Sequence, residues 1–118
     1  MKCLFVREPY AGWIVDGVKD IEYRTRATNI RGKIGIIQSK SGTVIGEVEI
    51  TGCTYNMEID LYEWSLAKGK RYAKPIPFKH KNGAVVWIEI DYDPKAQKSA
   101  PKLSPAEFKK QRKLYEAD

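Results

Sequence analysis

Histidine and cysteine are scarce in this chain of 118 residues, which has one histidine and two cysteines. Cys3 and Cys53 are too few for a disulfide scaffold, and with His80 they form no known metal-ligand spacing, so we expect no metal. Both cysteines lie in segments with strand character, which predicts that they are small buried side chains. A single histidine also excludes catalysis by a pair of histidines acting as acid and base.

Long apolar runs are also lacking. No stretch of about 18 apolar residues occurs, so we expect no membrane-spanning segment. The chain contains neither a P-loop nor a dinucleotide-binding glycine motif, so we expect no cofactor. It begins without the pattern of a signal peptide, which leads us to expect reduced thiols and a cytoplasmic protein.

Positive charge, in contrast, is in excess. Lysine and arginine number 21 against 15 acidic residues, and the net charge of +6 favours anionic partners, nucleic acid first. One basic cluster, residues 68–81, contains no acid and is interleaved with Tyr72, Phe78 and His80, a mixture that suits phosphates and bases. Its basic members are Lys68, Lys70, Arg71, Lys74, Lys79 and Lys81. A second basic group lies in residues 95–113. A solvated surface explains this group as well as a role in binding does.

Strand patterns either alternate apolar with polar side chains or run through β-branched residues. They occur at residues 2–6, 20–24, 33–38, 43–55 and 84–90. Gly46 and Gly52, inside the longest of these segments, predict bends or bulges. Residues 72–79 contain two prolines, which limits them to an edge strand or an extended loop. Asn82-Gly83 predicts the hairpin turn that leads into the last strand.

Three segments have helical patterns. Residues 9–16 form a short apolar run, and Gly17 follows where a helix takes a left-handed cap. Residues 57–67 carry apolar side chains at helical spacing, which predicts a second short helix. The sequence Ser104-Pro105-Ala106-Glu107 is a capping box at the start of a predicted basic helix over residues 105–116.

The order of these elements predicts a mostly β (α+β) fold. About six strands with glycine-rich bends indicate a small barrel of five to six strands, with two or three short helices at its periphery. The length fits one core-forming domain. We assign this domain to residues 1–92 and interpret residues 93–118 as a basic linker and C-terminal helix.

The most informative motif occupies residues 17–24, between the first helix and the second strand. It has the form Gly17-x-Lys19-x-x-Glu22-x-Arg24. A helix-to-strand junction is a place where side chains can converge on a cleft. Glu22 and Arg24 are two residues apart and therefore share one face of the predicted strand.

This motif resembles the signature of the ASCH domain family, which is related in fold to the PUA domain of RNA-modification proteins. Four further segments resemble the family's elements in the same order. They are residues 4–14 (LFVREPYAGWI), 31–36 (RGKIGI), 45–48 (IGEV) and 72–87, which contains Tyr72-Ala73, Pro75-Ile76-Pro77, Gly83 and Trp87. The resemblance covers residues 2–90.

The resemblance implies a PUA-like barrel with a cleft between the barrel and the first helix, lined by the signature residues. It implies RNA as a partner, because the family was proposed to bind RNA. It also implies enzymatic activity as an alternative, because one branch hydrolyses the acetyl amide of N4-acetylcytidine and other members have been linked to RNA cleavage.

Lys19 is our first candidate for a functional residue. In a partly dry cleft a lysine can hold a phosphate or an anionic intermediate, and when desolvated it can act as a base. The matching lysine of the hydrolase branch is catalytic. The alternative is a surface lysine that merely follows a helix cap.

Glu22 and Arg24 allow two interpretations. They form an internal ion pair that frames the cleft, or Arg24 contacts a phosphate or base edge while Glu22 orients Lys19. The hydrolase branch has threonine in place of Glu22 and needs a second, distal glutamate. The acidic residues in the matching region are Glu58, Asp60 and Glu63.

Three hypotheses for the function follow. The first is binding of RNA or a nucleotide-like ligand near Lys19 and Arg24. In it Tyr10 and Trp13 either stack on a base or belong to the core, and phosphates are contacted by Lys68, Lys70, Arg71, Lys74 and Lys79. The second is hydrolysis of a modified nucleoside or of RNA, with Lys19 and Glu22 as the catalytic pair. The third is a protein-interaction module that uses the basic C-terminal helix.

Overall fold

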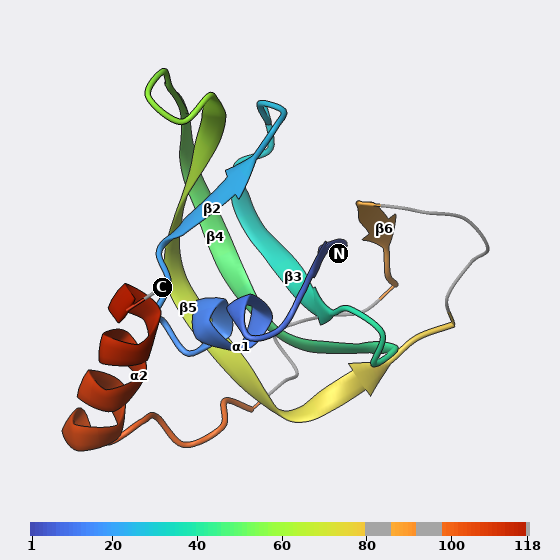
Figure 1. Cartoon of the computed structure of the whole chain (residues 1–118). Coiled ribbons are helices and arrows are strands. Elements are labelled where there is room, and N and C mark those ends of the chain that lie inside the picture. The colour runs from blue at the N-terminus through green and yellow to red at the C-terminus, as the bar shows by residue number, and fades with distance from the viewer. Residues whose placement is uncertain (80–85, 92–97, 118) are drawn as a thin grey trace.

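The structure, a computed structural model, is a six-stranded sheet with two helices and describes residues 1–79, 86–91 and 98–117 (Figure 1). The strands are β1 (Lys2–Val6), β2 (Ile21–Arg24), β3 (Gly32–Gln38), β4 (Thr43–Asn56), β5 (Leu61–Pro77) and β6 (Trp87–Glu89). The helices are α1 (Tyr10–Val15) and α2 (Pro105–Ala117). This composition confirms the mostly β fold class, the strand count and the first and last helices predicted from the sequence.

The strand order is β2-β5-β4-β3-β1-β6, and among these described strands only β1 and β3 pair in parallel. In the described part of the chain the two end strands, β2 and β6, form no ladder with each other, so backbone pairing leaves the sheet open. Side chains nevertheless bring its ends together. Trp64 of β5 stacks on Trp87 of β6, with 5.9 Å between ring centroids and 12° between planes. The predicted barrel is thus an open six-stranded sheet in the described residues, with side-chain contacts rather than backbone pairing between its ends.

The prediction of a helix over residues 57–67 is wrong. Residues 57–60 are the turn of a hairpin, and β5 begins at Leu61. The apparent helical spacing of Ile59, Tyr62 and Leu66 concealed a period of two, because Trp64 also faces inward. Trp64 and Leu66 are 3% and 7% exposed, whereas Ile59 is 48% exposed. Pairing of β5 with both β4 and β2 stabilises the extended form.

The long strands β4 and β5 bend as the glycines predicted. Their pairing shifts register between Val44 and Gly46 and again between Ile50 and Gly52. The proline-containing end of β5 pairs with β4 through Ile76 and Pro77, while β2 pairs only with residues 62–65. Within the described residues the prediction of an edge strand is therefore confirmed for Ile76 and Pro77, whereas Tyr72, at the start of the predicted segment, also forms a bridge with Ser99.

Helix α1 lies against the sheet and is buried from Ala11 to Val15 (Figure 1). Gly69 of β5 makes this close approach possible, since a Cβ atom there would lie 2.3 Å from the carbonyl oxygen of Ile14. The principal core joins α1 to residues of β1, β3, β4 and β5, among them Leu4, Ile36 and Val48. The core thereby fixes the end of α1, and with it the motif that follows, on the sheet.

Helix α2 begins with the N-cap half of the predicted capping box. The backbone N–H of Glu107 donates to Ser104 Oγ at 3.2 Å, and Ser104 Oγ donates to Glu107 Oε1 at 3.0 Å. Neither helix of the described residues combines the length and apolar character needed to cross a membrane. The predicted Asn82-Gly83 turn, with His80, Lys81 and the middle of the linker, lies outside the described residues.

Candidate functional site

The motif of residues 17–24 begins with a Schellman cap at the end of α1. Gly17 has a φ of +78°, its N–H donates to Ile14 O at 3.1 Å, and the Val18 N–H donates to Trp13 O at 2.9 Å. The N–H of Lys19 also donates to Trp13 O, at 3.1 Å. Glycine tolerates this left-handed backbone, which turns the chain sharply and places Lys19 beside α1.

Strand β2 then presents the two other charged residues of the motif. Its register with β5 places Glu22 opposite Trp64 and Arg24 opposite Tyr62. Glu22 and Arg24 share a face, and the guanidinium carbon of Arg24 lies 5.8 Å from the centre of the Trp64 ring. The indole of Trp64 is itself fixed, because its Nε1–H donates to Arg26 O at 3.0 Å.

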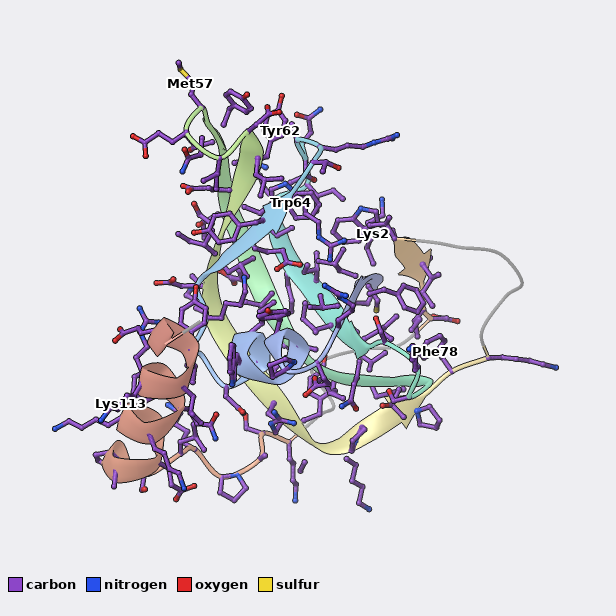
Figure 2. All side chains as sticks on the ribbon, in the orientation of Figure 1. Lys2, Met57, Tyr62, Trp64, Phe78 and Lys113 are labelled. Carbon is purple, nitrogen blue, oxygen red and sulfur yellow. The ribbon has the colours of Figure 1, made fainter. Side chains whose placement is uncertain are left out.

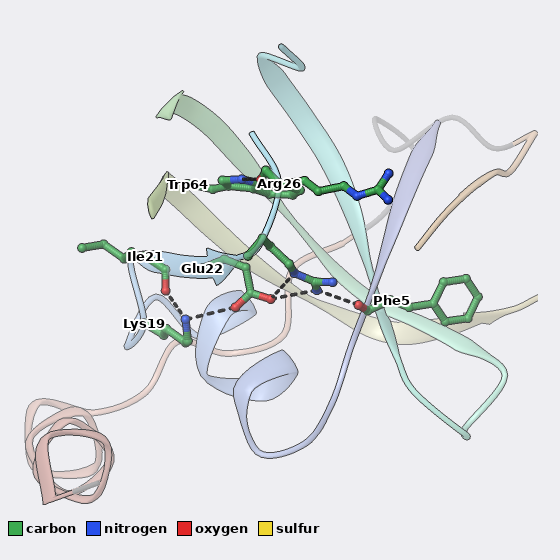
Figure 3. A network of polar contacts seen from close by, with 7 residues as sticks. Phe5, Lys19, Ile21, Glu22, Arg26 and Trp64 are labelled. Carbon is green, nitrogen blue, oxygen red and sulfur yellow. Dashed lines mark hydrogen bonds and ion pairs between the residues drawn. The ribbon is translucent and has the colours of Figure 1, made fainter. Parts of the chain in front are cut away.

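Glu22 joins Lys19 and Arg24 into one ionic network (Figure 3). Lys19 Nζ donates to Glu22 Oε1 at 3.1 Å and to the carbonyl oxygen of Ile21. Arg24 donates to Glu22 Oε2 from Nε at 3.0 Å and from Nη2 at 2.8 Å. Nη2 also donates to Phe5 O at 2.9 Å, which links β2 to β1. Both carboxylate oxygens of Glu22 are therefore engaged by cations.

The network is largely removed from water. The side chains of Lys19 and Glu22 are 5% and 10% exposed, and that of Arg24 is 25% exposed. Burial lowers the pKa of the Lys19 ammonium from its ordinary value of 10.5, although the negative charge and hydrogen bond of Glu22 act in the opposite direction. The lysine is thus no surface residue, and its proton is held less firmly than usual.

A cavity of about 840 Å³ opens beside this network. Lys19, Glu22 and Arg24 lie in its wall together with Tyr10 of α1, so the sequence prediction placed four lining residues in one site. Lys19 Nζ lies 6.0 Å from the centre of the Tyr10 ring and 5.4 Å from that of Tyr23. The remaining lining residues are Phe5, Val6, Arg7, Tyr23, Tyr115 and Glu116.

Trp13 does not line this cavity. Its side chain lies behind the wall, 8% exposed, between the rings of Tyr10 and Tyr115 at centroid distances of 5.6 and 5.4 Å. Its Nε1–H donates to Gln111 Oε1 at 3.2 Å. Trp13 was expected either to stack on a base or to belong to the core. This geometry favours the core, because neighbouring side chains already pack against its ring.

The described part of the basic cluster, residues 68–79, contributes no residue to this cavity. Arg71 donates to both carboxylate oxygens of Asp16, at 2.7 and 2.9 Å, and lines a second cavity of about 350 Å³ with Lys70. Lys68 is exposed and pairs with Glu49 at 3.8 Å. Lys74 and Lys79 are also exposed. The structure therefore does not bring the predicted phosphate-binding lysines to the motif.

The three acidic candidates for a distal glutamate also lie elsewhere. Glu58 and Asp60 are in the exposed turn between β4 and β5, and Glu63 accepts a hydrogen bond from Asn56 at 2.9 Å. Figure 2 shows Met57 at the projecting tip of this hairpin. The second carboxylate among the lining residues is instead Glu116 of α2.

Sequence reasoning missed three lining residues that bear on binding: Arg7, Tyr23 and Tyr115. Tyr23 lies within the motif, but side chains alternate along a strand, so Tyr23 was expected on the face of β2 opposite to Glu22 and Arg24. Tyr115 did share a helical face with Phe108 and Arg112. Nothing in the sequence indicated that this part of α2 docks on α1, which lies about a hundred residues earlier in the chain.

Comparison with known proteins gives a family and a fold. The model of the ASCH domain family matches residues 4–111, which includes the linker and the first half of α2. Among proteins with curated descriptions no sequence matches significantly.

The fold is similar to crystal structures of ASCH from Zymomonas mobilis. The unmutated protein has 15% identity and a TM-score of 0.54, over 64% of this chain and 72% of that chain. A tyrosine-to-phenylalanine mutant has 15% identity and a TM-score of 0.55, over 64% and 74%. A serine-to-alanine mutant has 14% identity and a TM-score of 0.58, over 96% and 94%.

Proposed function

The chain belongs to the ASCH domain family, and from this premise we propose that it binds RNA or a nucleotide-like ligand in the cavity beside Lys19, Glu22 and Arg24. The observation that carries the proposal is the buried ionic network in the wall of a cavity large enough for a nucleotide. Cys3 and Cys53 are free thiols, and a reducing compartment such as the cytoplasm is the proposed location.

Two cationic groups retain donors for such a ligand. Lys19 uses two of its three ammonium N–H bonds, on Ile21 O and Glu22. Arg24 uses Nε and Nη2, and within residues 1–79, 86–91 and 98–117 its Nη1 group has no hydrogen-bond acceptor. Glu22 holds both cations in fixed positions. An anionic oxygen or a base carbonyl entering the cavity would therefore meet donors that are already oriented.

The exposed lysines of β5 and its continuation would supply nonspecific phosphate contacts. Lys68, Lys74 and Lys79 lie on the surface, where they can attract the backbone of an RNA whose terminal or unstacked nucleotide enters the cavity. In this proposal the cavity and the surface lysines have different roles. The cavity determines where the ligand binds, and the surface lysines make the affinity depend on salt concentration.

Fluorescence anisotropy with a short labelled single-stranded RNA tests this proposal. We expect affinity to fall as salt rises, with a slope of about 0.7 per phosphate neutralised in a logarithmic plot. Lys19→Ala should weaken binding at every salt concentration. Lys113→Ala is the matched control, since it removes one charge from a side chain that points away from the body of the protein (Figure 2). Salt-insensitive binding, or equal affinities for the two variants, would contradict the proposal.

A second candidate is hydrolysis of a modified nucleoside at the same site. It is supported by the lowered pKa of Lys19, which leaves a larger fraction of its amine unprotonated at a given pH, and by its hydrogen bond to Glu22. Incubation with N4-acetylcytidine should then yield cytidine and acetate, and Lys19→Ala should abolish both. No turnover by the wild-type protein at high enzyme concentration would exclude this activity while leaving the binding proposal intact.

A further inference from the structure

The C-terminal end of α2 forms part of the cavity wall through Tyr115 and Glu116. Three contacts with the segment around α1 fix this end. Trp13 Nε1–H donates to Gln111 Oε1 at 3.2 Å, Arg112 donates to the carbonyl oxygen of Val18, and the Trp13 and Tyr115 rings meet edge to face at 69°. The position of Tyr115 is therefore set by the same residues that lead into Lys19.

The tyrosines of the lining come from three separate elements. Tyr10 belongs to α1, Tyr23 to β2 and Tyr115 to α2, and all three line the one cavity. Two of these rings lie near the ammonium of Lys19. Tyrosine rings offer flat apolar faces on which a planar ring can stack, whereas a bare phosphate gains little from them. The lining thus joins cations for an anionic group to rings for a planar one.

Tyr115 is distinctive among the three because it reaches the site from outside the matched segment. The family model ends at residue 111, and Tyr115 is four residues further along α2. Its ring is only partly exposed, and the guanidinium carbon of Arg112 lies 5.4 Å from its centre. Burial also raises the pKa of its phenol, consistent with a ring that lies against the site rather than in bulk water.

We propose that Tyr115 is a specificity-determining residue whose ring contacts a nucleobase, so that the cavity selects ligands that carry a base over sugar phosphates that lack one. This inference rests on the proposed binding function and names the part of the ligand that α2 recognises. A purely structural role, as a packing partner of Trp13, would instead affect ligands with and without a base to the same extent.

Paired ligands separate these roles. One is a short single-stranded RNA, and the other is an oligomer of equal length and charge with an abasic site in place of one nucleotide. We expect the wild-type protein to prefer the intact RNA, and Tyr115→Ala to reduce that preference by about fivefold or more, the lower range of base stacking on an aromatic ring. Tyr115→Phe retains the ring and should retain the preference. Leu114→Ala, a neighbouring exposed residue that does not line the cavity, should also retain it.

Tyr115→Leu serves as a second variant that keeps an apolar contact with Trp13 if the alanine variant fails to fold. Equal losses for intact and abasic oligomers, or an unchanged preference in the alanine and leucine variants, would overturn the inference alone. Binding that does not depend on Lys19 would overturn the proposed function and the inference together. Thermal unfolding of each variant separates a loss of recognition from a loss of folding.

Discussion

Glu22 lies between two cations, and because its side chain is only 10% exposed its negative charge depends on them rather than on water. The reverse also holds, because Lys19 and Arg24 are compensated chiefly by Glu22. In the described structure the three residues form one unit, in which removal of Glu22 would leave both cations partly buried and unpaired, whereas removal of either cation would leave Glu22 paired with the other. The ion pairs that position Lys19 and Arg24 at this site therefore also contribute to the stability of the folded protein.

We expect Glu22→Gln to lower the free energy of unfolding by about 3–5 kcal/mol, because removing one partner of a buried ion pair leaves an uncompensated charge. Urea denaturation measures the change. Glu58→Gln is the matched control: Glu58 lies in the exposed hairpin turn and should change stability by less than about 0.5 kcal/mol. If both variants have the same stability as the wild type, the network has no structural role.

The second prediction at the residue scale concerns pH. Burial lowers the pKa of Lys19 in the folded protein, and unfolding restores it towards 10.5. Below the lowered pKa both states are protonated, and the folded state bears the full cost of a buried charge. As pH rises through the lowered pKa towards 10.5, the unfolded state binds more protons, so the free energy of unfolding rises.

Urea denaturation of the wild type and of Lys19→Met, at several pH values between about 7 and 10.5, isolates this contribution. We expect the stability of the wild type relative to the variant to increase with pH, since the variant lacks the titrating group. A relative stability that falls with pH would show that the attraction of Glu22 outweighs the burial of Lys19.

At the scale of elements, the contact between α1 and β5 determines where the motif begins. It depends on Gly69, whose missing side chain admits the backbone of α1. The following Schellman cap turns the chain from α1 into β2, and the pairing of β2 with β5 holds the other end of the motif. Lys19 lies between α1 and β2, and both of these elements are held against β5.

We expect Gly69→Ala to destabilise the protein by about 1–3 kcal/mol, as overpacking does, because the new Cβ atom meets backbone that cannot rotate away. The same variant should displace α1 and weaken ligand binding. Gly52→Ala in β4 is the control, since its nearest contact would be 3.8 Å away. Chemical denaturation measures both, and equal stabilities would contradict the close approach of α1 to β5.

At the scale of the whole molecule, the two ends of the sheet meet through side chains. The Trp64–Trp87 stack joins β5 to β6, and the hydrogen bond from Arg24 to Phe5 O joins β2 to β1. Arg24 therefore belongs both to the cavity wall and to the closure of the sheet. A ligand that contacts Arg24 would act on a group that also holds two strands together.

A double-mutant cycle with Trp64→Leu and Trp87→Leu tests the closure. We expect a coupling energy of about 0.5–1.5 kcal/mol, the range for an aromatic pair beyond the area that it buries. Thermal or urea unfolding of the two single variants and the double variant gives this energy. Strictly additive effects would mean that the two rings contribute independently and that the stack does not hold the ends of the sheet.

The sequence by itself determined the features that depend on neighbouring residues. These include the β fold class, the cap at Gly17, the bulges in β4, the capping box of α2 and the motif of Lys19, Glu22 and Arg24. Each follows from local backbone preference or from alternation of side chains, which is encoded within a few residues.

Tertiary structure alone decided which distant residues meet. Residues 61–67 became strand because β2 and β4 flank them, although a helical period was also present. The Trp13 side chain packs between α1 and α2, and Arg71 pairs with Asp16. Tyr115 entered the cavity wall because α2 docks on α1. Such contacts join residues tens of positions apart, and they are selected by shape and burial of the assembled chain rather than by any local pattern.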